Sequence, residues 1–520
     1  MASFMPNEDR VTFDQIPEVI VYQILTFLDS AALASSASPT CFFFHVLSRY
    51  LQIKTPMWRT LHLLPNRKGD DLPGDDYSSY RATNPPRLSR DADTIPSLAR
   101  VVQNRTCSNI TLSIVFTTSG KTFKDLDLAS VLPKNAVAIG CESSTTATVS
   151  NLSAFPDEFV GPVENDGDVR HPNQETLGSV TFANIPESTL TVFEIPTATF
   201  RNGSADDCMQ KMPVCPLESG WSVVILMAPR TVNPNVLSDY IAKVHEQNKN
   251  VEIIGGIHMS SSSFIHKDGV SANKNSVVGV CVAGNVVYSS QISRACRPLG
   301  GLCEVTDSMS DEGWGAIAKV KRAEGGGGKE EPVENVAREA VMEMRARRTN
   351  ALFCGITDSM NKGFELLNIQ GIEAGALTLD GPAKVGSKMH FFTLDAESSQ
   401  EDLLGRLEAA RKAVEKTGKE ALGSILISCG GRGTGFYGEN NVESSIFSKQ
   451  LPGVGMSGFF SGGEIAPQAR AMMPYQSTFR GPTELQGFTS VFGVFYVPKF
   501  LTPTAHVWEA AIRDRTVNFA

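Results

Sequence analysis

The sequence predicts a multidomain protein in which a small all-α segment precedes a large α/β body with mixed, partly antiparallel sheets. The chain has 520 residues, which is enough for two or three domains with separate cores. Residues 13–62 carry apolar side chains at helical spacing, interrupted by Pro and Ser. From residue 98 onward, short apolar runs alternate with amphipathic helical patterns, which is typical of α/β folds.

The composition excludes several classes of protein. Hydrophobic residues make up 41% of the chain and charged residues 20%, as in globular proteins, and the net charge of -9 comes without a basic block for nucleic-acid binding. Residues 1–10 do not resemble a signal peptide, and the longest clean apolar run, 223–228, is too short to span a bilayer. We therefore expect a cytoplasmic or nuclear protein.

The cysteines and histidines indicate neither a disulfide framework nor a metal site. Ten cysteines are scattered without a Cys-x-x-Cys pair, which favours reduced thiols. His258 and His266 are separated by a serine run with no third ligand in view, and we expect them in a loop. The sequence predicts no metal and no cofactor.

The N-terminal segment begins with a helix. Pro17 suits the first helical position, and Glu18 places a negative charge at the positive end of the helix dipole, so a helix is predicted from there to Leu28. Further short helices are predicted to begin at Ser30, at Pro39 and at Thr55-Pro56, the last of which carries Trp58. A unit of about fifty residues cannot bury this many apolar side chains internally, so one face needs a partner.

The order and spacing of these residues resemble the F-box over residues 13–62. The residues that carry the resemblance are Ile16-Pro17-Glu18, Ile24-Leu25, Leu28, Leu33, Cys41 and Trp58. The resemblance implies binding to a Skp-type adaptor and, through it, to a cullin scaffold. The positions that it assigns to the adaptor contact are Pro17, Glu18, Leu25, Leu28, Leu33 and Cys41. The chain departs from the pattern at Phe42-Phe43-Phe44, and the alternative is a helical cap that packs on its own body.

The body follows a linker predicted at residues 63–97. Strands are predicted at 110–116, 136–140, 223–228, 251–255 and 424–428, with helices at 235–248, from Ser399 to Gly418, and at 441–449. Residues 276–282 and 286–292 are predicted to pair through a turn at Gly284-Asn285. Residues 319–331, which contain four consecutive glycines, are predicted to form a flexible loop. A helix, an apolar strand and a glycine turn recur around Gly255-Gly256 and Gly430-Gly431, which suggests duplication.

Two glycine-rich segments at strand ends are the candidate binding site. Residues 429–433, Cys-Gly-Gly-Arg-Gly, place exposed backbone N–H groups beside a guanidinium, an arrangement suited to a carboxylate or phosphate. Residues 458–467 end a buried strand in glycines and a single carboxylate. The candidate pocket residues are Cys429, Gly431, Arg432, Gly433, Gly463 and Glu464.

These segments resemble the FIST domain. The C-terminal part is carried by the two glycine segments with Asn441-Val442-Glu443 and residues 485–491; the N-terminal part is echoed by residues 138–141, 254–256, 291–300 and 305–306. The resemblance implies a sensory module for small ligands such as amino acids, and an F-box followed by FIST implies a ligase receptor family. The resulting domain limits are 13–62 F-box, 63–97 linker, 98–318 FIST N-terminal part, 319–335 loop, 336–498 FIST C-terminal part and 499–520 tail.

Sharper interpretations of the same motifs remain open at this point. Cys429 beside Arg432 could be an activated thiol nucleophile, although a packed cysteine at a strand end fits better. Residues 433–438 satisfy G-x-G-x-x-G, but two aromatic residues in the turn would crowd a pyrophosphate. Arg432 and Glu464 either form an ion pair between two loops or line a pocket.

The sequence thus favours a non-enzymatic substrate receptor of a Skp–cullin–F-box (SCF) ubiquitin ligase. Its expected partners are a Skp-type adaptor, a cullin scaffold, the protein to be ubiquitinated and a small ligand of the FIST body. The alternatives are a ligand sensor without a ligase role and an enzyme that depends on Cys429 or on a nucleotide.

Overall fold

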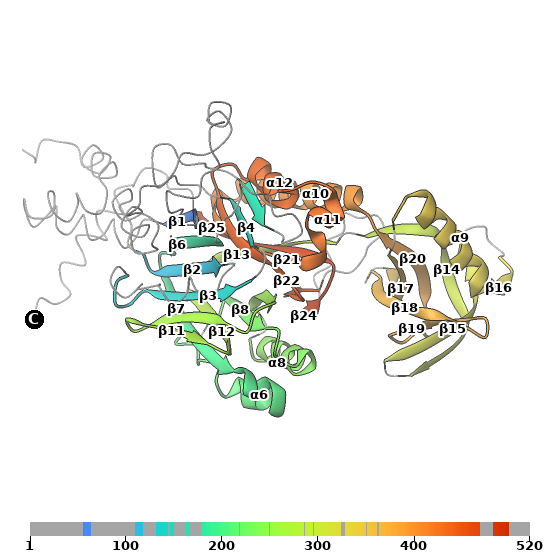
Figure 1. Ribbon diagram of the computed structural model, residues 1–520, viewed down its shortest axis with the longest axis horizontal. Helices are drawn as coiled ribbons and strands as arrows, with labels where there is room; N and C mark the ends of the chain where they lie inside the picture. The colour runs from blue at the N-terminus through green and yellow to red at the C-terminus, as the bar shows by residue number, and fades with distance from the viewer. Residues whose placement is uncertain are drawn as a thin grey trace, which may run out of the picture.

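The computed structural model describes residues 56–63, 110–117, 132–149, 162–165, 178–468 and 482–498, apart from residues 144–145, 218, 249, 285, 295, 312, 324–327, 350 and 361–362. These residues form a large layered body and a smaller barrel that projects from one end of it (Figure 1). The predicted adaptor positions from Pro17 to Cys41 lie outside the described residues. The mixed α/β body is confirmed, whereas the all-α segment is not among the described elements.

The body contains three six-stranded sheets. The first has the order β1 (Met57–Leu63), β6 (Gly178–Asn184), β2 (Leu112–Thr117), β3 (Val137–Glu142), β10 (Ser263–Lys267), β11 (Val270–Lys274). The second has the order β24 (Thr483–Gln486), β23 (Glu464–Pro467), β9 (Glu252–His258), β8 (Val223–Pro229), β12 (Ser276–Gly284), β7 (Ser188–Pro196). The third has the order β13 (Val287–Arg294), β25 (Thr489–Pro498), β21 (Lys419–Cys429), β22 (Gly455–Ser461), β4 (Thr146–Val149), β5 (Pro162–Asn165).

One apolar core joins the three sheets, and helices cover two outer faces. Ile114 of β2, Ile225 of β8 and Ile427 of β21 belong to the same buried cluster. The outer face of the third sheet is covered by α10 (Ala396–Glu415) and α12 (Val442–Gln450). The outer face of the second sheet is covered by α6 (Thr197–Asn202), α7 (Ala205–Met209) and α8 (Pro234–Gln247), so that helices flank the sheets above and below in Figure 1.

Among the described strands, three neighbouring pairs are parallel. In each pair, the second strand has a glycine opposite its paired residue on the first strand. The pairs are β2 with β3, β8 with β9 and β21 with β22. A Cβ atom at Gly140, Gly255 or Gly458 would lie 2.2, 2.0 or 2.0 Å from the carbonyl oxygen of the residue paired with it on the first strand. Only glycine permits so close an approach. Each of these parallel pairs therefore requires a glycine where its two strands approach each other.

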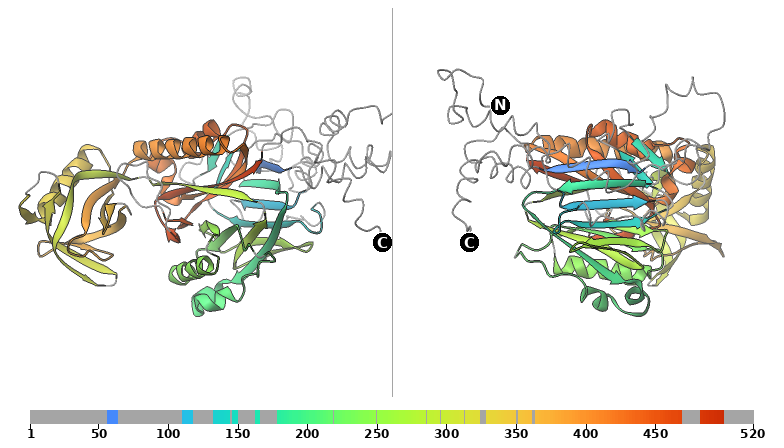
Figure 2. Two further views of the ribbon diagram at one scale, coloured as in Figure 1. Left: turned by 180° about the vertical axis from the view of Figure 1, so that it is seen from behind. Right: turned by 60° about the vertical axis from the view of Figure 1, so that its left-hand side comes forward.

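The barrel is closed by antiparallel pairing. Its strand order is β14 (Cys296–Asp311), β20 (Lys388–Leu394), β17 (Leu352–Thr357), β18 (Glu365–Glu373), β19 (Ala376–Leu379), β15 (Trp314–Arg322), with β14 pairing β15 to close it and β16 (Glu330–Pro332) added beside β15. Helix α9 (Val333–Ala346) packs on the core of the barrel through Val336 and Ala340. Figure 2 shows that the barrel stands apart from the layered body.

Most predicted elements of the body are confirmed within a few residues, but the two ends of the loop predicted at 319–331 are strand, while its residues 324–327 lie outside the described residues. Residues 319–322 belong to β15, and Glu330–Pro332 pairs with them as β16. Arg322 and Glu331 form an ion pair of 2.7 Å across this hairpin. The described ends of this segment therefore belong to the barrel.

The predicted hairpin of residues 276–292 is also wrong. Strand β12 pairs with β7 on one edge and with β8 on the other, so neither edge is open to β13. Instead, β13 crosses to the third sheet and pairs with β25. Gly284 has a positive φ of 108°, and it lies where the chain leaves the second sheet for the third, not in a hairpin turn.

Three local predictions also need correction. The helix predicted from Pro56 is strand β1, in which Trp58 stacks on Phe495 at 5.1 Å between ring centroids. His258 and His266 are fully buried in β9 and β10 and do not lie in a loop. Helix α10 begins at Ala396 with Asp395 as its N-cap, so the predicted capping residue Ser399 lies within the helix.

Candidate functional site

The two predicted glycine segments meet at one edge of the third sheet. Cys429 ends β21 and Ser461 ends β22, and these residues are paired in the parallel register. The carboxyl ends of parallel strands lie at the same edge, which is where open α/β sheets place their ligands. We call residues 429–433, 461–464 and 487–489 the carboxyl rim.

The end of β9 joins the carboxyl rim from the second sheet. The Ile257 N–H donates to the Gly463 carbonyl at 2.9 Å, and the Gly462 N–H donates to the Ile257 carbonyl at 2.8 Å. The Ser461 hydroxyl donates to the same Gly463 carbonyl at 2.6 Å. The second glycine segment therefore ties two sheets together.

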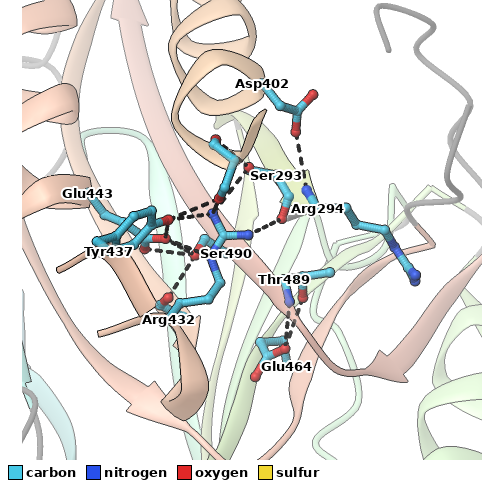
Figure 3. Close-up of polar contacts among 11 residues, drawn as sticks. Ser293, Arg294, Asp402, Arg432, Tyr437, Glu443, Glu464, Thr489 and Ser490 are labelled. Atoms are coloured by element: carbon cyan, nitrogen blue, oxygen red, sulfur yellow. Dashed lines mark hydrogen bonds and ion pairs between the residues drawn. The ribbon is translucent and has the colours of Figure 1, made fainter. Parts of the chain in front are cut away.

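Arg432, in the 3-10 turn η7 (Gly430–Arg432), lies at the centre of a buried hydrogen-bond network (Figure 3). Its Nε donates to Glu443 Oε1 at 2.7 Å, and this ion pair is almost completely buried. The remaining contacts of the guanidinium are Ser293 O at 3.2 Å, Ser293 Oγ at 3.3 Å, Ser399 Oγ at 2.5 Å and Tyr437 OH at 2.9 Å. These partners come from β13, α10, α11 (Thr434–Tyr437) and α12.

Glu443 is satisfied from the opposite side as well. Tyr437 OH donates to its Oε1 at 2.7 Å, and the Ser490 hydroxyl lies 2.6 and 2.7 Å from its two oxygens. Burial acts to lower the pKa of Arg432, but Tyr437 and Glu443 raise it, and the net pKa lies above the usual value. Arg432 is therefore a charged structural group whose Nε, Nη1 and Nη2 each donate to a group of the fold. An ion pair between Arg432 and Glu464 does not form.

Glu464 is the second buried charged residue of the carboxyl rim, and its surroundings differ. Its Oε2 accepts hydrogen bonds from the N–H of Thr489 at 3.3 Å and from the Thr489 hydroxyl at 2.9 Å. Its Oε1 has no hydrogen-bond partner among the described residues, although the side chain is fully buried. Burial raises the pKa of Glu464 to about 8. Its carboxyl group is therefore mostly protonated at neutral pH.

Cys429 adjoins Glu464 and is half-buried. Burial, followed by the Glu464 carboxylate, raises the pKa of the Cys429 thiol, although the N–H groups of Gly431 and Phe488 and the charge of Arg432 act in the opposite direction. A reactive thiolate requires a lowered pKa. The geometry therefore does not support the interpretation of Cys429 as an activated nucleophile.

The remaining predicted pocket residues have separate roles. Gly431 is exposed on the carboxyl rim, whereas Gly463 is buried beneath it and bonds to β9. Gly433 is buried and precedes α11. Tyr437, one of the two aromatic residues inside the G-x-G-x-x-G match, points into the Arg432 network instead of leaving room for a pyrophosphate.

No local signal in the sequence predicts the hydrogen-bond partners of Arg432 or Glu464. Glu443 belongs to the FIST-like motif, but no pairing with Arg432 is predicted for it. Its position in the first turn of α12 is the one local feature that marks it. Ser399 is predicted as a helix cap, and Ser293 and Ser490 lie in the FIST-like segments 291–300 and 485–491, but nothing in the local sequence pairs these three serines with Arg432 or Glu443. Thr489 is the second residue after Gly487 and lies in the motif at 485–491.

A depression lies between the C-terminal half of α10 and the C-terminal end of α12. Its volume is about 510 Å³, and it is lined by Leu404, Glu408, Arg411, Glu415, Lys449, Gln450 and Pro452. None of these residues belongs to the carboxyl rim. Within the described part of the chain, no cluster of His, Cys, Asp and Glu suits a metal ion, and no helix is long and apolar enough to cross a membrane.

Comparison with known proteins supports the C-terminal resemblance. Residues 334–467 match the FIST C domain, a span that runs from α9 to β23 and includes Arg432, Glu443 and Glu464. An uncharacterized protein of Mycobacterium bovis is 33% identical over 121 residues, and one of Mycobacterium tuberculosis is 32% identical over 121 residues. The alignment covers 23% of this chain and 28% of each relative.

Proposed function

We propose that the layered body and barrel form a FIST-type binding module that senses a small ligand at the carboxyl rim. The observation that carries this proposal is the meeting of β9, β21 and β22 at one edge, where exposed glycines adjoin the half-buried Cys429 and the partly satisfied Glu464. Ligands of open α/β sheets bind at such edges. The FIST C match spans most of the residues involved.

The chemistry of the carboxyl rim favours binding over catalysis. The pKa of Cys429 is raised, and the Arg432 guanidinium is buried and pairs with Glu443. Glu464 Oε1 lacks a hydrogen-bond partner among the described residues and is fully buried at the carboxyl rim. We therefore expect a receptor that reports occupancy without turning over its ligand.

A thermal-shift screen of the full chain against cationic, anionic and neutral metabolites tests the proposal. A ligand present at 100 times its dissociation constant stabilises the folded state by about 2.7 kcal/mol. Gly431→Val places a side chain on the exposed rim, where a built Cβ lies 3.9 Å from Cys429 Sγ, and we expect it to reduce this gain. A screen in which none of the three classes raises the melting temperature would contradict the proposal.

The depression between α10 and α12 provides the matched control. Lys449→Ala removes one side chain from that depression and leaves the carboxyl rim unchanged. We expect the same ligand-induced shift as in the wild type. If Lys449→Ala abolishes the shift and Gly431→Val does not, the ligand binds in the depression and the proposed site is wrong.

A second candidate function is that of an SCF substrate receptor. The specific observation is the F-box-like series from Ile16 to Cys41, which lies outside both the FIST C match and the described residues. In this proposal the N-terminal segment binds a Skp-type adaptor and a cullin scaffold, and the FIST body binds the protein to be ubiquitinated. The chain then acts in the cytoplasm or nucleus by raising the effective concentration of the substrate near ubiquitin carried by partner subunits.

Co-purification of the adaptor separates the two functions. Leu25→Asp/Leu28→Asp places two charges on the predicted contact face, and we expect it to abolish adaptor recovery while ligand binding to the body persists. Glu8→Lys, a charge change before the predicted helix, is the control and should leave recovery unchanged. If the wild type recovers no adaptor, or the double variant recovers as much as the wild type, the receptor function is excluded.

A further inference from the structure

The carboxyl rim contains a two-residue link whose backbone is strained. Gly487 and Phe488 connect β24 of the second sheet to β25 of the third. Phe488 has a positive φ of 59°, a conformation that is unfavourable for a bulky side chain and that glycine adopts freely. Gly487 has no positive φ, and a Cβ atom on it would meet nothing within 4 Å. The strain therefore lies on the residue with the large side chain, although a glycine stands directly beside it.

Two contacts hold Phe488 in this conformation. On the side of the body, its N–H donates to the sulfur of Cys429. On the side of the barrel, its ring lies 5.1 Å from the ring of Phe353, measured between centroids. A strained residue persists where its surroundings outweigh the cost of the strain. The contact with the body and the contact with the barrel therefore depend on the same backbone conformation.

The residues on either side of the link are anchored. Gln486 Nε2 donates to the Pro467 carbonyl at 3.3 Å, and the Thr489 hydroxyl donates to Glu464 Oε2 at 2.9 Å. A change of backbone conformation between these anchors is therefore confined to residues 487–488. Hinges of this kind absorb a large dihedral change in a few residues at the ends of elements.

The ring contact can be released while the barrel stays packed. Phe353 is buried in an aromatic cluster with Phe364 and Phe392, whereas Phe488 is 40% exposed and belongs to neither apolar core of the barrel. The barrel stands apart from the layered body, and the chain connects the two at the ends of β13 and β20 (Figure 2). The Phe488 ring is therefore a contact between the two regions that packing alone does not fix.

We propose that the Gly487-Phe488 link is a switch through which the carboxyl rim controls the contact between the body and the barrel. A ligand that contacts Cys429 in place of the Phe488 N–H removes one of the two supports, so Phe488 relaxes to a negative φ and its ring leaves Phe353. Such a ligand binds the relaxed state better than the strained one, which is the condition for a population shift. This inference rests on the proposed sensor function and states how occupancy of the same site is reported.

Hydrogen–deuterium exchange of the full chain, followed by mass spectrometry, tests the switch without a ligand. Cys429→Ala removes the sulfur that accepts the Phe488 N–H. We expect exchange to become at least about threefold faster both at residues 487–489 and at residues 351–354 of the barrel. Coupling is reciprocal, so Phe353→Leu, which removes the ring on the barrel side, should also accelerate exchange at residues 487–489.

Phe488→Gly separates the switch from a general loosening of the rim. Glycine keeps the N–H and adopts the positive φ without strain, but it has no ring. In this background, Cys429→Ala should leave exchange at residues 351–354 unchanged. Cys215→Ala, at a half-buried cysteine outside the carboxyl rim, is the matched control and should leave exchange in both segments as in the wild type.

The switch is wrong if Cys429→Ala leaves the barrel unchanged, or if it accelerates exchange there equally with and without the Phe488 ring. An unchanged link in Phe353→Leu would also overturn it. These outcomes are independent of the thermal-shift screen. Coupling in a chain for which the screen finds no ligand would contradict the sensor function alone, and a ligand without coupling would overturn the switch alone.

Discussion

Arg432 and Glu464 are both buried ionisable residues at the same sheet edge, yet every nitrogen of the Arg432 guanidinium has a partner, whereas one oxygen of Glu464 has none among the described residues. Arg432 joins four elements through Ser293, Ser399, Tyr437 and Glu443. Glu464 is bonded to Thr489 alone and keeps one oxygen unpartnered within the described chain. The difference teaches that burial of a charge does not by itself indicate a ligand site. An incomplete set of partners is the more informative sign.

Removal of the Arg432 charge should have the largest effect on stability. Arg432→Ala leaves the Glu443 carboxylate buried beside polar groups without a cation, and we expect a loss of about 3–5 kcal/mol in the free energy of unfolding, measured with urea. Arg411→Ala, which breaks the exposed ion pair with Glu415, is the control and should cost at most about 1 kcal/mol. Similar effects of the two variants would show that the Arg432 network is not structural.

The pH dependence of stability should distinguish Glu464 from Arg432. Because the folded-state pKa of Glu464 is raised to about 8 from a usual value of 4.5, the folded state holds its proton more tightly than the unfolded state. This contribution is fully present below pH 4.5 and is lost as the pH rises to about 8, with a slope of at most about 1.4 kcal/mol per pH unit.

Glu464→Gln should therefore be relatively more stable than the wild type as the pH rises through this window. The measurement is the difference in unfolding free energy between the two proteins at several pH values. A difference that stays constant from pH 5 to about pH 8 would show that Glu464 titrates as an ordinary carboxyl group.

The smallest expected effect concerns the contact between the carboxyl rim and the barrel. Phe488 has a positive φ of 59°, and its ring lies 5.1 Å from that of Phe353 in β17. We expect Phe488→Ala to cost about 0.5–1.5 kcal/mol, and a double-mutant cycle with Phe353→Ala to assign most of that cost to the ring contact. Ile372→Ala, at a similarly exposed apolar residue of the barrel, should be close to neutral. Additive effects of the two Phe variants would mean that the rings do not couple the regions.

Elements that depend on local sequence signals agree with their predictions. The predicted helix at 235–248 corresponds to α8, which begins at Pro234, because proline at the first position and regular apolar spacing are local signals. The predicted strand at 223–228 corresponds to β8, whose continuous apolar run suits a strand buried on both faces. The glycine segments at 429–433 and 458–467 also mark the rim correctly, since glycine at a strand end has a local steric cause.

The predictions that failed are those in which the pairing partner of a strand, or the packing partner of a side chain, determines the local structure. Strand β13 leaves β12 because both edges of β12 are occupied, and no residue in the 284–286 turn records that fact. Trp58 joins a strand because its ring fits against Gly423, where a Cβ atom would come within 2.0 Å of the indole. Local helix signals such as Pro56 are weaker than the burial of a large aromatic side chain.

The sequence alone determined the α/β character of the body, its glycine turns and the placement of Cys429, Arg432 and Glu464 at strand ends. Only the tertiary structure decided which of the two charges is available, because their partners lie in distant segments: Ser293 is 139 residues from Arg432, and Thr489 is 25 residues from Glu464. A local motif determines which strand end carries a charged residue, whereas tertiary packing determines which donors and acceptors contact its side chain. The incomplete bonding of Glu464 is therefore a property of the fold.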